Sequence, residues 1–312
     1  MSDYILNLLP VKEEEKQEFE AIAPKAVHVY ARRRTVTPEQ LQAATVIFGW
    51  PRPKDLASAE KLEWFQSMWS GTDEYMGEGV LPPKAMMTSS SGSNSLSVAE
   101  HMLACLLALC RCLPVYRDNQ RAHCWKDEGA MKSVFGSTVL VVGAGNIGSA
   151  FASRCRSLGA RTIGVKRKVT GEVEGFDQVF PMEELDALLP QADVVVLVLP
   201  HSPHTVHLMD EARIALLKED AILISAGRGT VLDQEALVRA MKEGKLWGAA
   251  LDVAETEPLP QDSPLWDIPN LLITPHVAGG MRLEVTRRTC IQMALDNLRR
   301  YVAGEPLANR VK

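Results

Sequence analysis

The sequence lacks CxxC cysteine pairs, long basic runs and long apolar stretches. Its six cysteines are scattered through mostly apolar segments, as is typical of buried thiols in a reducing compartment and not of a disulfide framework. The longest apolar run, Met102–Cys110, is about half as long as a bilayer span, so no membrane helix is expected. A net charge of −5 argues against a nucleic-acid surface, which needs a basic face.

Signals for targeting and for a metal site are also weak. The N-terminus has neither the basic flank nor the apolar core of a secretory signal, so a cytoplasmic location is expected. The cations Arg32–Arg34 are interpreted as a solvated turn. His201, His204 and His207 recur every third residue, but no cysteine or carboxylate accompanies them at a recognised ligand spacing, and no metal site is predicted.

What is present indicates a two-domain α/β protein. A length of 312 residues is long for a single core, and 46% hydrophobic with 23% charged residues is ordinary for a globular chain. In the first hundred residues, short apolar segments alternate with helix-like ones, which predicts a parallel sheet covered by helices. The strands expected there are Tyr4–Leu9, Val27–Tyr30, Thr45–Phe48, Trp64–Ser67 and Met86–Thr88.

The alternation becomes sharper after a serine-rich segment, Ser89–Ser93, whose position suits a hinge between domains better than a mere flexible linker. An apolar helix is expected over Val98–Leu113, and Pro114 should stop it or lie just past its end. A last amphipathic helix is expected over Glu284–Tyr301. Six buried strands are predicted between these helices: Thr138–Val142, Thr162–Val165, Val194–Leu199, Ala221–Ser225, Gly248–Asp252 and Leu271–Ile273.

A GxGxxG motif lies between the first of these strands and a predicted helix, the context in which the motif indicates dinucleotide binding. Gly143 permits the tight turn, Gly145 lets backbone amides approach the pyrophosphate, and Gly148 lets the helix pack closely on the strand. The start of the helix then offers partial positive charge to the phosphates. The cofactor contacts expected in this loop are Gly143, Gly145, Asn146, Ile147 and Gly148.

The end of the next strand indicates which cofactor binds. An NAD enzyme usually has an acidic residue there, which grips the ribose hydroxyls. This sequence has Lys166, Arg167 and Lys168 instead, three cations that would attract a 2′-phosphate. NADPH is therefore the predicted cofactor, with NADH still possible.

Arg228, Glu257 and His276 each follow a different predicted strand, so their loops should converge outside the carboxyl ends of one sheet. Each of these residue types suits the reduction of a 2-oxo acid. The planar fork of Arg228 can hold carboxylate and carbonyl oxygens together. His276 can supply a proton near neutral pH, and Glu257, if it contacts the imidazole, would favour the protonated form.

The chain resembles the D-isomer-specific 2-hydroxyacid dehydrogenase family, with matching motifs in order over nearly half its length. The motifs are Gly143–Gly148, Gly227-Arg228-Gly229, Leu251-Asp252-Val253 with Glu257-Pro258, and Thr274-Pro275-His276. The resemblance implies Arg228 as the substrate clamp, Glu257 and His276 as the pair that handles the proton, Asp252 as a contact to the nicotinamide carboxamide, and Leu199, Pro200 and Ala226 beside the cofactor. Ser225 departs from the asparagine that is common in the family.

Further similarities lie in the first hundred residues. Gln66–Asp73 is similar to the substrate loop of the family, which implies that the backbone amides of Ser70 and Gly71 bind the substrate carboxylate. The segment Phe48–Pro51 is similar to the active-site lip of the short NADPH-dependent glyoxylate/hydroxypyruvate reductases. Two tryptophans, Trp50 and Trp69, are then expected beside a small substrate, although both could equally be packing residues.

The predicted architecture is two doubly wound parallel-sheet domains, a Rossmann cofactor domain inserted into a flavodoxin-like substrate domain. The substrate domain is expected over residues 1–100 and 283–312, and the dinucleotide-binding domain over residues 101–282. The resemblance also implies a homodimer formed through the cofactor domains and the helix at Val98–Leu113.

The predicted function is NADPH-dependent reduction of small 2-oxo acids, of the glyoxylate or hydroxypyruvate kind, to D-2-hydroxy acids. One alternative is NAD-dependent oxidation of a 2-hydroxy acid, formate or phosphite, against which the cations Lys166–Lys168 argue. A second alternative is a nucleotide-sensing corepressor that binds partner proteins. That function would need an added docking surface or extended tails, and the sequence shows neither.

Overall fold

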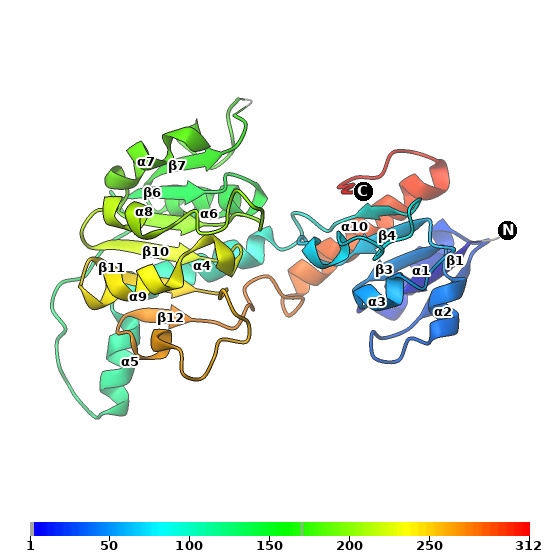
Figure 1. Cartoon of the computed structure of the whole chain (residues 1–312). Helices are drawn as coiled ribbons and strands as arrows, with labels where there is room; N and C mark the ends of the chain where they lie inside the picture. The colour runs from blue at the N-terminus through cyan, green and yellow to red at the C-terminus, as the bar shows by residue number, and fades with distance from the viewer. Residues whose placement is uncertain (1–2, 170) are drawn as a thin grey trace. The chain divides into compact units, whose positions relative to one another are not determined.

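The computed structural model describes residues 3–169 and 171–312 (Figure 1). The chain forms two compact units, one of Met1–Asn94 with Met281–Lys312 and the other of Ser95–Gly280. Compared with the domain ranges expected from the sequence, the change between units comes earlier along the chain, because helix α4 (Ser95–Cys110) lies wholly in the second unit.

The first unit contains a five-stranded sheet in the order β2-β1-β3-β4-β5, in which every pair is parallel. This is the flavodoxin-like order. Phe19 and Ile291 belong to the core on one face, while Leu41 and Leu56 belong to the core on the other. The elements are β1 (Tyr4–Asn7), α1 (Glu13–Ile22), β2 (Val27–Tyr30), α2 (Pro38–Ala43), β3 (Val46–Gly49), α3 (Pro53–Leu56), β4 (Trp64–Ser67), β5 (Met86–Thr88) and α10 (Glu284–Ala303).

The second unit contains a seven-stranded sheet in the order β12-β11-β10-β9-β6-β7-β8, again with parallel pairs. Helices α7, α8 and α9 cover one face, and α4 and α6 cover the other (Figure 1). The further elements are α5 (Leu113–Arg121), β6 (Thr138–Val142), α6 (Asn146–Ser157), β7 (Arg161–Lys166), β8 (Gln178–Pro181), α7 (Leu185–Leu188), β9 (Val194–Leu197), α8 (Glu211–Leu216), β10 (Ala221–Ser225), α9 (Gln234–Lys242), β11 (Leu246–Leu251) and β12 (Leu271–Ile273).

The two doubly wound parallel sheets confirm the predicted fold class, and they place the ligand edge of the second unit. The strand order reverses where β6 lies between β7 and β9. In such sheets ligands bind outside the carboxyl ends of the strands, at this switch point. The GxGxxG motif directly follows β6.

Two elements of the second unit, strand β8 and helix α5, were not predicted from the sequence. Strand β8 was missed because it is a four-residue edge strand, partly exposed, that ends in a proline. Pro114 lies past the end of α4, one of the two expected positions, but it belongs to a second helix that was not predicted: it is in the first turn of α5, where a missing N–H costs nothing. The chain passes from α4 to α5 through Cys112, whose φ is 53°.

The serine-rich segment Ser89–Ser93 is packed into the first unit. Ser90 has no exposed surface, and its hydroxyl donates to the carbonyl of Ser67 at 2.7 Å. Gln66 donates to the same hydroxyl at 3.2 Å. The segment therefore ends just before the boundary at Asn94, but it is not a free flexible linker.

The cysteines are free thiols, and all but Cys124 are buried. Burial raises the pKa of Cys105 and of Cys290 to about 11 and that of Cys155 to about 12. In the described part of the chain, no single helix has the length and apolarity to cross a bilayer; α4 and α5 would together, by length and composition only, with a bend of 67°. The expected cytoplasmic location stays a prediction.

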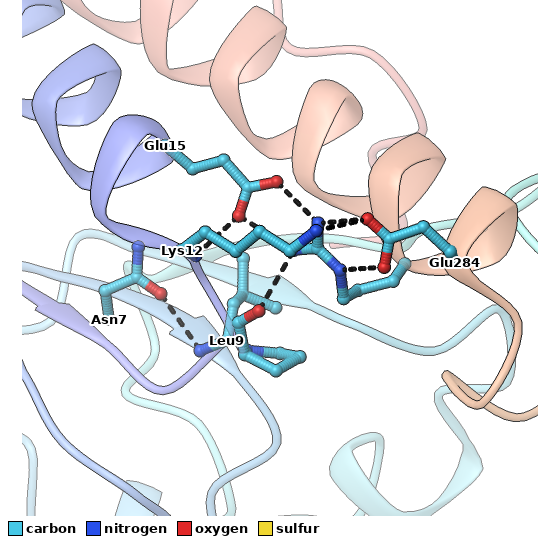
Figure 2. A network of polar contacts seen from close by, with 7 residues as sticks. Asn7, Leu9, Lys12, Glu15 and Glu284 are labelled. Carbon is cyan, nitrogen blue, oxygen red and sulfur yellow. Dashed lines mark hydrogen bonds and ion pairs between the residues drawn. The ribbon is translucent and has the colours of Figure 1, made fainter.

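A buried arginine joins the two chain segments of the first unit. Arg287, on α10, is 7% exposed and binds Glu15 of α1 with Nη1–Oε2 and Nη2–Oε1 distances of 2.7 and 2.8 Å. It also donates to Glu284 and to the carbonyl of Pro10. Figure 2 shows Glu15 and Glu284 reaching toward the same guanidinium from the two helices.

These ion pairs make the carboxylates harder to protonate. The hydrogen bonds from Arg287, followed by that from Lys12, lower the pKa of Glu284 from 4.5 to about 2. Arg287 likewise lowers the pKa of Glu15. Because the folded-state pKa lies below the unfolded value, this contribution to stability is present above about pH 4.5 and is lost as the pH falls toward 2.

We expect Arg287→Met to lower the free energy of unfolding by roughly 3 kcal/mol, since it leaves Glu15 without its buried partner. Urea unfolding at neutral pH measures this loss. The control is Arg288→Met, an exposed neighbour, which should change the stability by less than about 0.5 kcal/mol. The difference between wild type and Arg287→Met should narrow at about pH 3. If the free energies of unfolding of wild type and Arg287→Met differed equally at neutral pH and at about pH 3, the ion pairs would not account for the loss of stability.

Candidate active site

Three loops of the second unit start at neighbouring strands. Strands β10, β11 and β12 lie side by side and parallel, so the segments after Ser225, Leu251 and Ile273 begin at the same edge of the sheet. These segments carry Arg228, Glu257 and His276.

The glycines on either side of Arg228 pack where no side chain fits. A Cβ added to Gly227 would come within 2.5 Å of the carbonyl oxygen of Leu199, and one added to Gly229 within 2.0 Å of that of Ala254. Both distances are shorter than side-chain contacts allow. The backbone around Arg228 is thus fixed against the loops that follow β9 and β11.

The imidazole of His276 is held by a carboxylate. The distance from Nδ1 of His276 to Oε2 of Glu257 is 2.9 Å. The other oxygen of Glu257 accepts a hydrogen bond from the amide of Ala254 at 3.0 Å. Both side chains are partly exposed, at 49% for His276 and 39% for Glu257. The pair can therefore orient the ring while leaving it open to a ligand.

The loop that carries His276 is anchored to Asp252, which is 5% exposed. The Asp252 carboxylate accepts from the Thr274 hydroxyl at 2.6 Å and from the amides of Val277 and Ala278, both at 3.0 Å. The carbonyl of Asp252 accepts from the amide of His276 at 2.7 Å. The expected contact of Asp252 with the nicotinamide carboxamide stays a prediction.

Two glycines of the glycine loop lie where a side chain would not fit. Gly143 has a φ of 120°, and a Cβ on Gly148 would lie 2.3 Å from the carbonyl oxygen of Gly143. A Cβ on Gly145 would meet nothing within 4 Å in the part of the chain described. Gly145 precedes α6 without a side-chain cap, so the first amides of the helix can bind an anion. Asn146 is exposed and Ile147 is half-buried.

The basic cluster lies beside this loop. The amides of Gly143 and Ala144 donate to the carbonyl of Val165, at 2.9 and 3.0 Å. Lys166 follows directly as the last residue of β7, and Arg167 and Lys168 are exposed beyond it. Within residues 3–169 and 171–312, none of the three forms an ion pair with a carboxylate. The cluster is therefore free to bind a phosphate.

The segment after β9 also borders the glycine and arginine loops. A Cβ on Gly143 would lie 2.8 Å from the carbonyl oxygen of Val198, and the amide of Ala226 donates to the carbonyl of Leu197 at 3.1 Å. Leu199 is buried and Pro200 is exposed. The residues expected beside the cofactor thus lie along one edge of the sheet.

These features match known proteins. The model of the D-isomer specific 2-hydroxyacid dehydrogenase family, NAD binding domain, matches residues 103–278, more than half of the chain. The chain belongs to this family.

Three members illustrate the likeness to the dehydrogenase family. A family protein from Aeromonas salmonicida subsp. salmonicida A449 is 32% identical over 100% of this chain and 99% of its own, with a TM-score of 0.87. One from Xanthobacter autotrophicus Py2, solved with NADPH and MES, is 29% identical over 100% and 98%, with a TM-score of 0.81. A glyoxylate reductase from Korarchaeum cryptofilum is 37% identical over 57% of this chain and 53% of its own.

Family members differ in length and in named activity. The chain spans about half the length of the curated D-3-phosphoglycerate dehydrogenases that it matches at 31% to 34% identity. Family membership makes this chain an NAD(P)-dependent oxidoreductase of the 2-hydroxyacid dehydrogenase kind.

The expected substrate-binding residues of the first unit form a cluster of their own. The rings of Trp50 and Trp69 meet edge to face, with centroids 5.5 Å apart. The indole of Trp50 donates to Glu74 at 2.6 Å. The hydroxyl of Ser70 donates to Asn94 at 2.9 Å, which fixes the loop that contains Gly71.

Sequence reasoning misread Arg33 and overlooked Glu74. Arg33 was interpreted as part of a solvated turn, but its guanidinium lies 3.6 Å from the centroid of the Trp50 ring. It is half-buried, whereas Arg32 and Arg34 are exposed. Stacking of the Arg33 guanidinium on the indole of Trp50 explains why Arg33 is less exposed than its two neighbours. No local sequence signal marks this contact, since the two residues lie in different loops.

Of the three histidines that recur every third residue after β9, two contact polar side chains. His201 contacts the hydroxyl of Thr230 at 2.9 Å, and His207 contacts Glu255 at 3.1 Å. Both contacts join the segment after β9 to the loops that follow β10 and β11. Ser225 has a buried hydroxyl with no hydrogen-bond partner among the described residues, which is the only local effect seen at this departure from the family.

Proposed function

We propose that this chain reduces small 2-oxo acids to D-2-hydroxy acids with NADPH. The observation that carries the proposal is the 2.9 Å contact between His276 and Glu257, on loops at the same sheet edge as Arg228 and the glycine motif. A 2-oxo acid carries a carboxylate beside a ketone, and its reduction requires an anion clamp and a proton donor. Those side chains support this function.

Each side chain has one proposed role. Arg228 holds the carboxylate and ketone oxygens, since its fork can bind two oxygens at once. His276 donates the proton to the ketone oxygen. Because Glu257 engages Nδ1, the proton leaves through Nε2. Glu257 orients the ring and favours its protonated form before transfer.

The residues of the second unit fit a bound dinucleotide. The glycine loop and the start of α6 would hold the pyrophosphate, with Leu199, Pro200, Ala226, Arg228 and Asp252 as further contacts. Bound NADPH supplies the hydride. The 2′-phosphate would be bound by Lys166, Arg167 and Lys168. This role is supported because none of the three is paired with a carboxylate in the described residues. The Xanthobacter relative was solved with NADPH, in line with this preference.

We expect the double variant Lys166→Ala and Arg167→Ala to raise the Kd for NADPH by about tenfold or more while changing that for NADH little, because each charge-assisted bond to phosphate is worth about 1.5–3 kcal/mol. Fluorescence titration of both cofactors measures this. The control is Arg161→Ala, at the opposite end of β7. Equal weakening of NADPH and NADH would overturn the proposed phosphate site.

The proposed substrates are small. As the resemblance implies, Trp50 and Trp69, which pack edge to face, would border the substrate, and the amides of Ser70 and Gly71 would bind its carboxylate. The Korarchaeum relative is named a glyoxylate reductase, which supports this class. A kcat/KM that rises from glyoxylate to phenylpyruvate would contradict the assignment.

A spectrophotometric assay tests the activity. NADPH or NADH is incubated with the purified chain and glyoxylate, hydroxypyruvate, pyruvate or phenylpyruvate in turn, and NAD is incubated with a 2-hydroxy acid, formate or phosphite. We expect oxidation of NADPH with the first two acids. Turnover only with NAD and a hydroxy acid, formate or phosphite would favour the first alternative. No turnover with any pair would favour a nucleotide-sensing binding protein.

We also propose a homodimer formed through the second units and α4. The support is exposed apolar side chains on α4 and on the segment that follows it: Leu107 and Leu113 are exposed, and Trp125 is fully so. Helix α5 buries none of its residues. A second copy of the chain would cover these side chains, as large exposed apolar residues favour association. A monomeric mass by light scattering would contradict the proposal.

A further inference from the structure

We propose that His101, on α4, is a positioning residue for His276 and holds the catalytic loop through Thr274 and Asp252. The proposal rests on the proposed function, because it assigns His101 a role in keeping the proton donor in place. No role was predicted for His101 from the sequence.

The hydrogen bonds fix the direction of donation. The hydroxyl of Thr274 donates to the Asp252 carboxylate at 2.6 Å, and a hydroxyl has a single proton to donate. Nε2 of His101 lies 3.0 Å from the same hydroxyl oxygen, which must therefore accept. His101 thus donates through Nε2–H. Its Nε2 also lies 3.8 Å from Oδ1 of Asp252.

Helix α4 holds the loop at two points. Ser97 lies one turn before His101 on the same face of the helix, and its hydroxyl donates to the carbonyl of Ala278. His101 holds Thr274, at the other end of the loop. Asp252 binds Thr274, Val277 and Ala278 between these points. The segment around His276 is therefore tied both to β11 and to α4.

His276 needs such support because its backbone is strained. Its φ is 50°, in the left-handed region that a residue with a side chain seldom adopts. Strain of this kind costs about 1–3 kcal/mol and persists only where the surroundings hold it. If His101 no longer donates, the Thr274 end of the loop loosens, and the imidazole is less often placed for proton transfer. A misplacement of about 1 Å can cost as much as 100-fold in rate.

The test compares His101→Leu with His101→Gln. Leucine fills similar space without a donor, whereas the amide of glutamine can reach the position of Nε2 and donate to Thr274. We expect His101→Leu to lower kcat by about tenfold, with the KM for the 2-oxo acid and the Kd for NADPH changed by less than about twofold. His101→Gln should recover most of the loss. Glu100→Gln, an exposed neighbour on α4, is the control.

Two measurements separate positioning from packing. The Kd for NADPH, read by fluorescence without turnover, reports whether the cofactor site is intact. The melting temperature reports stability. Equal losses of kcat in His101→Leu and His101→Gln, or a loss of NADPH affinity as large as the loss of kcat, would overturn the proposal. An inactive wild type would refute the proposed function instead, and an active wild type with an unimpaired His101→Leu would refute this inference alone.

Discussion

His276→Ala is expected to lower kcat for 2-oxo acid reduction by about 10²–10⁴-fold, the usual contribution of a positioned acid, and to change the Kd for NADPH by less than about twofold. The variant removes the proposed donor but leaves the glycine loop and the basic cluster intact. Stopped-flow measurement of NADPH oxidation, with a fluorescence titration of NADPH, gives both quantities.

A second variant, at the carboxylate that contacts His276, tests the role of the pair. Glu257→Gln keeps an oxygen that can accept from Nδ1 but removes the negative charge that favours protonated His276. We expect a smaller loss of kcat than for His276→Ala. If NADPH affinity falls as far as kcat in His276→Ala, the histidine serves cofactor binding and its proposed role is misassigned.

Arg228→Lys is expected to lower kcat/KM for the 2-oxo acid by about 100-fold, mostly through KM, although the positive charge is retained. Lysine offers a point charge where arginine offers a planar fork, so at least one charge-assisted bond of about 1.5–3 kcal/mol is lost. The backbone cannot shift to compensate, because Gly227 and Gly229 are pressed against neighbouring carbonyls.

The control for this variant is Arg239→Lys, a surface arginine of α9 that pairs with Glu211. It should leave kcat/KM within about twofold of wild type, as surface substitutions usually do. Steady-state kinetics over a range of 2-oxo acid concentrations measures both variants. An unchanged KM in Arg228→Lys would show that the guanidinium does not bind the substrate.

Most of the fold could be predicted because buried parallel strands are continuous apolar runs. Val194–Leu197 is such a run, and the glycine motif after Val142 marks the ligand edge of the sheet. Strand β8 has neither signal: it lies at the edge and ends in Pro181. Helix α5 was not predicted because a proline after an apolar helix can mark either the end of that helix or the first turn of another.

Only those residues of the candidate site that directly follow a strand could be predicted to lie together. Arg228, Glu257 and His276 each follow a strand, so the parallel order of the strands brings their loops to one edge. His101 and Thr274 are separated by 173 positions, and their contact depends on how α4 packs on the sheet. No pattern within either segment could have indicated it.

The most direct test follows the transferred hydrogen. NADPH deuterated at the transferable position of C4 is incubated with hydroxypyruvate and the purified chain, and the product is analysed by NMR and chiral chromatography. We predict D-glycerate with deuterium at C2 from wild type, and almost none from His276→Ala. Glycerate of the L form, or glycerate without deuterium at C2, would contradict hydride transfer of the kind proposed.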